Sequence, residues 1–187
     1  MDRQLIIAGF GGQGVLLMGQ LLAYAGMESD KQVSWMPSYG PEMRGGAANC
    51  AVVISDAEVG SPKVEDANIV IAMNRPSMEL FERNVVPGGT LLVNSSLIDV
   101  EPTRSDIRIV KVPTSELAVE AGSERAANMV MLGAYAGLTG DFSIELLMDA
   151  LRHKLGPGKE KLMPANQKAM ELGSASAQAQ TDAGKRG

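Results

Sequence analysis

The stretch LIIAGFGGQGVLLMGQLL, residues 5–22, joins an apolar run to a glycine-rich turn and then to a helical pattern. A short apolar run such as residues 5–8 is typical of a buried strand, and residues 15–22 suit a helix. Glycines between them let the backbone turn sharply, while N–H groups at the helix start attract an anion. The residues that predict this phosphate cradle are Gly9, Gly11, Gly12, Gln13 and Gly14.

The spacing fits the dinucleotide pattern GxGxxG, which also requires an acidic residue at the end of the second strand, about 20 residues on. Here the second expected strand, residues 32–36, runs into Pro37, while Glu28 and Asp30 precede it. The sequence therefore disfavours a nicotinamide-dependent dehydrogenase. That class and a non-enzymatic nucleotide-sensing module remain alternatives, because the turn by itself names no ligand.

Strand-like runs and helical patterns alternate along the chain. Strands are expected at residues 5–8, 33–36, 48–55, 68–73, 90–94 and 107–112, and helices beginning near residues 15, 76, 114, 126, 143 and 159. This order predicts an α/β fold, a Rossmann-like three-layer sandwich with a mostly parallel sheet. We expect a single domain over residues 1–173 and a flexible tail at residues 174–187, whose small and polar side chains bury little.

Local signals refine three of these helices. Asn74 is a candidate N-cap for the helix that Pro76 opens, and Ser143 for the helix that follows it in sequence. Residues 126–138 are apolar nearly all round, which indicates a helix buried against the sheet or a partner. Gly133 and Gly137 would let a neighbouring element approach this helix closely.

Charge and composition exclude several classes of protein. The chain has 187 residues and a net charge of −5, with 17 basic and 22 acidic residues, so a nucleic acid is not an expected partner. No apolar run approaches the roughly 18 residues that a bilayer span needs, and no signal peptide precedes the first strand. We therefore expect a cytoplasmic protein with no membrane partner. Because Cys50 is the single cysteine, the chain can hold neither an internal disulfide nor a four-cysteine cluster.

A second glycine-rich segment, SYGPEMRGG at residues 38–46, follows the second expected strand. Loops at the carboxyl ends of strands are where α/β proteins place their ligands. The guanidinium of Arg44 could hold an anion through its planar fork, or it could pair with Glu42 in a merely structural loop. We expect both glycine-rich segments to form one anion-accepting crevice. The further candidate binding residues in this segment are Ser38, Tyr39, Gly40, Glu42, Arg44, Gly45 and Gly46.

Residues for acid–base or nucleophilic chemistry are scarce. The single histidine, His153, lies between Arg152 and Lys154 near an expected helix end, where a cation complements the helix dipole. Cys50 lies in an apolar strand, where a buried and inert thiol is the expected state. We therefore predict no catalytic residue and no metal ligand in this chain.

Three motifs taken together resemble the gamma subunit of the 2-oxoacid:ferredoxin oxidoreductases. They are GFGGQGV at residues 9–15, SYGPEMRGG at residues 38–46 with ANC at residues 48–50, and NMVMLG at residues 128–133. The resemblance covers about residues 3–172, and the form of the second motif is most like the 2-oxoglutarate or ketoisovalerate branch.

The resemblance implies a multi-subunit enzyme that decarboxylates a 2-oxoacid, passes the acyl group to coenzyme A and reduces ferredoxin. Thiamine diphosphate and magnesium would lie between alpha and beta subunits, and iron–sulfur clusters on beta or a ferredoxin-like delta subunit. The gamma chain would bind none of these alone and would be inactive in isolation. Its expected share is to pack on alpha and beta and to help form the coenzyme A side of the active site.

Overall fold

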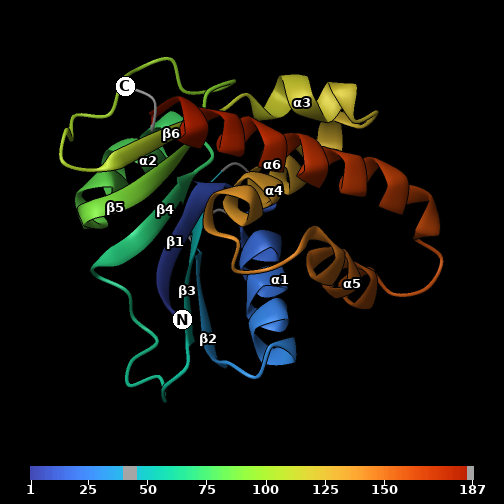
Figure 1. Cartoon of the computed structure of the whole chain (residues 1–187), viewed down its shortest axis with the longest axis horizontal. Coiled ribbons are helices and arrows are strands. Elements are labelled where there is room, and N and C mark those ends of the chain that lie inside the picture. The colour runs from blue at the N-terminus through green and yellow to red at the C-terminus, as the bar shows by residue number, and fades with distance from the viewer. Residues whose placement is uncertain (40–45, 185–187) are drawn as a thin grey trace. The chain divides into compact units, whose positions relative to one another are not determined.

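The computed structural model describes residues 1–39 and 46–184 (Figure 1). The chain divides into two compact units, Met1–Val110 and Lys111–Gly187. The first contains the glycine-rich turn and most of the sheet, and the second contains the long C-terminal helix. The prediction of a single domain over residues 1–173 stays a prediction.

The α/β class is confirmed by a six-stranded sheet with the strand order β2-β3-β1-β4-β5-β6. The strands are β1 (Asp2–Phe10), β2 (Gln32–Tyr39), β3 (Ala47–Ser55), β4 (Ala67–Ala72), β5 (Val85–Asn94) and β6 (Arg108–Val112). The α-helices are α1 (Val15–Glu28), α2 (Arg75–Phe81), α3 (Thr114–Glu120), α4 (Ala127–Thr139), α5 (Ile144–Leu155) and α6 (Met163–Gly184). Single 3-10 turns occur at η1 (Glu82–Asn84), η2 (Glu124–Ala126) and η3 (Glu160–Leu162).

Pairing within the sheet is mixed. β1 pairs in parallel with β4, and β4 in parallel with β5, as expected of a Rossmann-like sheet. β3 instead runs antiparallel to both of its neighbours, β1 and β2. The reason is the short connection from β2 to β3, residues 40–46, because a parallel pair needs a crossover of about a dozen residues or more. β3 is thus inserted between two strands, β1 and β2, that point the same way.

The sheet has a topological switch point between β1 and β4. From β1 the chain continues through α1 to β2 on one side, and from β4 it continues through α2 to β5 on the other. The carboxyl ends of these two parallel strands are neighbours, because Ala8 pairs with Ala72. A crevice at such a point is the usual ligand site of a doubly wound sheet.

Helix α1 lies close to β2 and β3 because two of its glycines leave room for them. A Cβ on Gly19 would come within 2.5 Å of Cys50 Sγ, and one on Gly26 within 2.8 Å of Val33 Cγ2. The two glycines are seven residues apart and therefore lie on the same helix face. This face packs α1 against β2 and β3.

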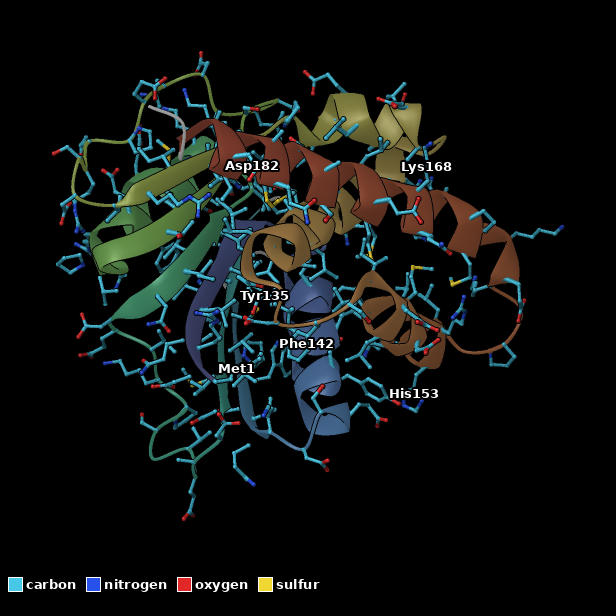
Figure 2. All side chains as sticks on the ribbon, viewed as in Figure 1. Met1, Tyr135, Phe142, His153, Lys168 and Asp182 are labelled. Carbon is cyan, nitrogen blue, oxygen red and sulfur yellow. The ribbon has the colours of Figure 1, made fainter. Side chains whose placement is uncertain are left out.

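Helices α4 and α6 of the second unit approach each other through glycine on both sides. A Cβ on Gly133 would overlap the backbone of Met170, and one on Gly173 would overlap the carbonyl of Val130. The close approach expected at Gly133 and Gly137 is confirmed, since Gly137 faces Ser174 in the same way. The expected burial of the 126–138 segment is confirmed as well, with Tyr135 fully buried (Figure 2).

The sequence predicted a flexible tail from residue 174, whereas the structure continues α6 to Gly184. Lys168 and Asp182, both labelled in Figure 2, lie on this one continuous helix. Ala177 is fully buried, and the side chain of Gln180 binds the backbone of Lys111. Small residues therefore suffice for packing here, because the neighbouring helix also presents small residues.

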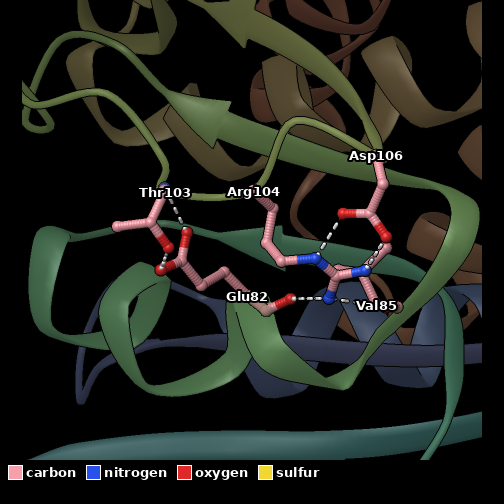
Figure 3. A network of polar contacts seen from close by, with 5 residues as sticks. All are labelled: Glu82, Val85, Thr103, Arg104 and Asp106. Atoms are coloured by element: carbon pink, nitrogen blue, oxygen red, sulfur yellow. Dashed lines mark hydrogen bonds and ion pairs between the residues drawn. The ribbon is translucent and has the colours of Figure 1, made fainter.

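A polar cluster fixes the segment between β5 and β6 to the end of α2 (Figure 3). The carboxylate of Glu82, which is 8% exposed, accepts from the N–H of Thr103 at 2.9 Å and from its hydroxyl at 2.7 Å. The guanidinium of Arg104 binds both carboxylate oxygens of Asp106 and donates to the carbonyl of Val85. These bonds satisfy the buried carboxylate and hold an otherwise irregular segment in place.

Within the described ranges, no helix has the length and apolar character to cross a bilayer.

Candidate functional site

The glycine-rich turn has the backbone geometry that the sequence predicts. Gly12 has a φ of 100° and Gly14 a φ of 72°, a region in which residues with a Cβ are strained. Gly14 is the N-cap of α1 and provides no side chain to bind the first helical N–H groups. These N–H groups have no carbonyl partner inside the helix, so they are available to an anion.

The structure joins the two glycine-rich segments at their ends. The N–H of Gly11 donates to the carbonyl of Gly46 at 2.9 Å, directly beyond the last β1–β3 pair, Phe10 and Ala47. This contact brings the start of β3 beside the turn. Ser38 and Tyr39 belong to the end of β2 and lie opposite Asn49 and Ala48.

Four of the predicted binding residues fall outside the described residues. They are Gly40, Glu42, Arg44 and Gly45. The expectation that Arg44 shares a crevice with the turn therefore stays a prediction, although Gly46 supports it by ending the same segment beside Gly11.

An open hollow of about 290 Å³ lies on the β3 side of the turn. Its lining consists of Phe10, Gly11, Gly12, Gly14, Val15, Leu16 and Ala48. Phe10 is 40% exposed, which is unusual for an aromatic ring at the end of a central strand. The hollow therefore combines a glycine backbone at a helix start with an apolar wall, a combination that suits a ligand with both phosphate and apolar parts.

The side chain of Gln13 is engaged with groups of the protein, a role that the sequence did not reveal. Its Oε1 accepts from the N–H of Phe10 at 2.6 Å and from Asn74 Nδ2 at 3.1 Å. Its Nε2 donates to the carbonyl of Met73 at 3.2 Å. Gln13 thus ties the turn that follows β1 to the residues that follow β4.

Gly9 leaves the space that this side chain needs. A Cβ at Gly9 would come within 2.6 Å of Gln13 Oε1 and 2.9 Å of Val15 Cγ1. Gly9 thus has a packing role beneath Gln13, and the ligand role that the sequence predicts for it stays a prediction. By contrast, a Cβ on Gly12 would meet no described atom within 4 Å.

Two asparagines extend the contacts of Gln13 along the edge of the sheet. The expected cap at Asn74 is confirmed, because its Oδ1 accepts from the N–H of Ser77 at 2.9 Å. Asn94, at the end of β5, donates from Nδ2 to the same Met73 carbonyl at 3.1 Å. The carboxyl ends of β1, β4 and β5 are thus connected by side-chain amides.

Comparison with known proteins bears on both the fold and the family of the chain. The profile of the pyruvate ferredoxin/flavodoxin oxidoreductase family matches residues 4–176. The chain belongs to this family. The resemblance drawn from the three sequence motifs is confirmed.

Among curated members of the family, the ketoisovalerate oxidoreductase subunit VorA of Methanothermobacter marburgensis is 43% identical over 170 residues. This alignment covers 90% of the chain but only 35% of VorA. The 2-oxoglutarate synthase subunit KorC of the same organism is 37% identical over 181 residues, covering 92% of the chain and 97% of KorC.

Two solved structures share the fold of this family member. The gamma subunit of a keto/oxoacid ferredoxin oxidoreductase from Geobacter sulfurreducens superposes with a TM-score of 0.80 at 31% identity, covering 95% of the chain and 99% of that subunit. The 2-oxoglutarate:ferredoxin oxidoreductase from Magnetococcus marinus, solved with 2-oxoglutarate, coenzyme A and succinyl-CoA bound, has a TM-score of 0.86 at 27% identity. That alignment covers 95% of this chain and 31% of the Magnetococcus chain.

The thiol of this family member is buried and inert, as predicted. Cys50 is fully buried and donates its S–H to the carbonyl of Val15 at 3.6 Å. Burial raises the pKa of Cys50 to about 12, so the thiol stays protonated at neutral pH. Cys50 therefore packs α1 on β3 and carries no thiolate chemistry.

His153 lies in the last turn of α5, between Arg152 and Lys154, as the sequence predicts (Figure 2). A hollow of about 300 Å³ adjoins it, with Arg152, Lys159 and Glu160 among its lining residues. The three basic residues complement the carboxyl end of the helix. Over residues 1–39 and 46–184, no three His, Cys, Asp or Glu side chains gather closely enough to hold a metal ion.

Proposed function

We propose that this chain is the gamma subunit of a 2-oxoglutarate:ferredoxin oxidoreductase. The complex would convert 2-oxoglutarate and coenzyme A to succinyl-CoA and carbon dioxide, and would pass two electrons to ferredoxin. The observation that carries the proposal is the alignment with KorC, which extends over 97% of that 2-oxoglutarate synthase subunit. The Magnetococcus neighbour, a 2-oxoglutarate enzyme, supports the same substrate.

Ketoisovalerate is the second candidate substrate. The identity to VorA is 43%, higher than the 37% to KorC, which favours this branch. The chain matches only 35% of VorA, however, so that relative contains a large part with no counterpart here. The residues that select the oxoacid would belong mainly to other subunits under either proposal.

The chain's own share would be the coenzyme A side of the active site. The turn at Gly12 and Gly14, at the start of α1, offers backbone N–H groups for a phosphate of coenzyme A, and Phe10 offers an apolar surface beside them. Gly46 attaches the second glycine-rich segment to this turn, which supports placing Arg44 near the same phosphate. The chain would bind and orient coenzyme A without taking part in bond breaking.

Thiamine diphosphate, magnesium and the iron–sulfur clusters would belong to alpha, beta and a ferredoxin-like delta subunit. Thiamine diphosphate would supply the decarboxylation chemistry and the clusters would carry electrons to ferredoxin. The donor set of this chain supports that division, because its single thiol, Cys50, is buried and protonated. A complex that uses ferredoxin and coenzyme A would act in the cytoplasm.

The proposal is tested by expressing the chain with its alpha, beta and delta partners and measuring viologen reduction that depends on coenzyme A. We expect activity in the complex and none in the isolated chain, with the highest kcat/KM for 2-oxoglutarate. A higher kcat/KM for ketoisovalerate would select the second candidate. Dye reduction by the isolated chain would contradict the proposed division of labour.

The coenzyme A role is tested with Arg44→Ala in that complex. Loss of one charge-assisted contact to phosphate removes about 1.5–3 kcal/mol, so the KM for coenzyme A should rise about ten- to a hundredfold. Arg44→Lys should recover part of this loss, since lysine keeps the charge but not the fork. Arg152→Ala is the matched control, because Arg152 pairs with Asp149 on the exposed face of α5.

A further inference from the structure

Gln13 lies at the point of the sheet where a doubly wound fold usually binds its ligand. The carboxyl ends of β1 and β4 are adjacent there, and the chain leaves the two strands toward opposite sides of the sheet. The side chain of Gln13 starts on the turn after β1 and reaches the carbonyl of Met73, the residue after β4. A side-chain amide of the protein therefore spans the switch point.

The hydrogen-bonding capacity of this amide is largely used inside the protein. Oε1 accepts two hydrogen bonds, from Phe10 and from Asn74, and Nε2 donates one to Met73. Asn74 and Met73 are only 3% and 1% exposed, so two of the three partners of Gln13 are buried residues. The amide is held by one hydrogen bond at the end of β1 and by two hydrogen bonds to the residues that follow β4. It is therefore a rigid support for the turn that carries it.

Gly9 strengthens this interpretation. Because Gly9 has no Cβ, there is space for Gln13 Oε1. The same glycine-rich motif therefore contains both the glutamine and the glycine that makes room for its side chain. The hollow lined by Gly11, Gly12 and Gly14 lies on the β3 side of the same turn. The turn thus has a side closed by Gln13 and an open side toward β3.

We propose that Gln13, held by Asn74, is a positioning residue that closes the switch point and fixes the turn so that its N–H groups face the hollow beside β3, where a phosphate of coenzyme A binds. The proposal rests on the coenzyme A role given above. Gln13 acts through the backbone of Gly12 and Gly14 and need not touch the ligand, while the N–H of Gly11 stays bound to Gly46.

Two variants remove the support while preserving the rest of the site. Gln13→Met keeps a side chain of similar length without its hydrogen bonds, and Asn74→Ser keeps an N-cap for α2 but is too short to reach Gln13. In the reconstituted complex, each variant should raise the KM for coenzyme A about tenfold. This is the change in affinity expected when the binding free energy of about one hydrogen bond is lost. The KM for 2-oxoglutarate should change less than about twofold.

The double variant tests whether the residues act as one unit. Because both single changes break the same support, Gln13→Met with Asn74→Ser should raise the KM for coenzyme A no further than Gln13→Met alone. Asn84→Ser is the matched control, since Asn84 Nδ2 donates to the carbonyl of Glu65 at an exposed position. It should leave the KM for coenzyme A unchanged.

Hydrogen exchange on the full chain without partners gives a readout independent of activity. Backbone amides of residues 9–18 should exchange faster in Gln13→Met and Asn74→Ser than in the wild type or Asn84→Ser. A lower Tm with an unchanged KM for coenzyme A would make Gln13 merely structural and overturn the proposal. Independent, multiplicative effects of the two changes would overturn it as well.

Gly12→Val separates this proposal from the coenzyme A role itself. If Gly12→Val raises the KM for coenzyme A and Gln13→Met does not, the turn binds coenzyme A but Gln13 does not position it. If neither variant changes that KM, the coenzyme A role of the turn fails, and the present inference fails with it.

Discussion

The side-chain amide of Gln180 binds both backbone polar groups of Lys111. Its Oε1 accepts from the Lys111 N–H at 3.0 Å, and its Nε2 donates to the Lys111 carbonyl at 2.7 Å. Lys111 belongs to β6, the last strand in the sheet order. At this one residue the amide makes the two hydrogen bonds that a neighbouring strand would make, which blocks part of an open sheet edge.

We expect Gln180→Ala to lower the free energy of unfolding by about 1–2 kcal/mol, because two backbone groups at the edge lose their partner. Urea denaturation followed by circular dichroism measures this change. Gln178→Ala is the control, since Gln178 is an exposed residue of the same helix and its loss should cost less than about 0.5 kcal/mol. Equal effects of both changes would show that the Lys111 contact adds nothing.

Gly133→Ala should destabilise the chain by about 3 kcal/mol or more, at the upper end of overpacking effects. The added methyl would meet the backbone of Met170, which cannot move without separating α4 from α6. Thermal unfolding should show the loss as a lower Tm. Gly60→Ala, where a Cβ meets no described atom within 4 Å, should leave the Tm nearly unchanged. A stable Gly133→Ala chain would contradict the close helix contact.

Cys50 should resist alkylation by iodoacetamide at pH 8 in the native chain and react fully in guanidinium chloride. Burial raises its native pKa to about 12, whereas a thiol in the unfolded chain ionises near about 8.5. The unfolded state therefore loses its proton first, so this contribution to stability is complete below about pH 8.5 and is lost as pH rises toward about 12. The difference in stability between the wild type and Cys50→Ala should shrink over that interval. Rapid native labelling would show that the thiol is accessible.

The Arg104–Asp106 pair should contribute to stability at neutral pH and cease to do so in acid. The hydrogen bond from Arg104 lowers the native pKa of the Asp106 carboxyl below its usual value. A lowered native pKa means that the contribution is present above the unfolded pKa of about 3.9 and is lost as pH falls through the native value. Asp106→Asn should thus lower the Tm at pH 7 and have a smaller effect at pH 3. An effect of equal size at both values would exclude the ionised pair as its cause.

Features of the site that depend on neighbouring residues in the chain could be predicted from the sequence. Residues 5–22 predict a strand, a turn with glycine at strained positions and a helix, and the structure confirms each, with Gly12 and Gly14 at positive φ. Asn74 and Ser143 are helix caps, as expected. These features depend on interactions within a few residues along the chain, so composition and spacing suffice to predict them.

Contacts between distant segments required the tertiary structure. The prediction that Gln13 contacts a ligand stays a prediction, whereas the structure shows that its side chain binds Met73 and Asn74, about 60 residues away. The antiparallel insertion of β3, the continuation of α6 to Gly184 and the pairing of Gln180 with Lys111 are likewise decided by which segments meet in space. The sequence by itself determined the class of the fold, its family and the phosphate-type turn, because these depend on local backbone preference and hydrophobic pattern. Only the folded chain decided which side of that turn is closed, because hydrogen bonds between residues so far apart form only after the sheet has brought them together.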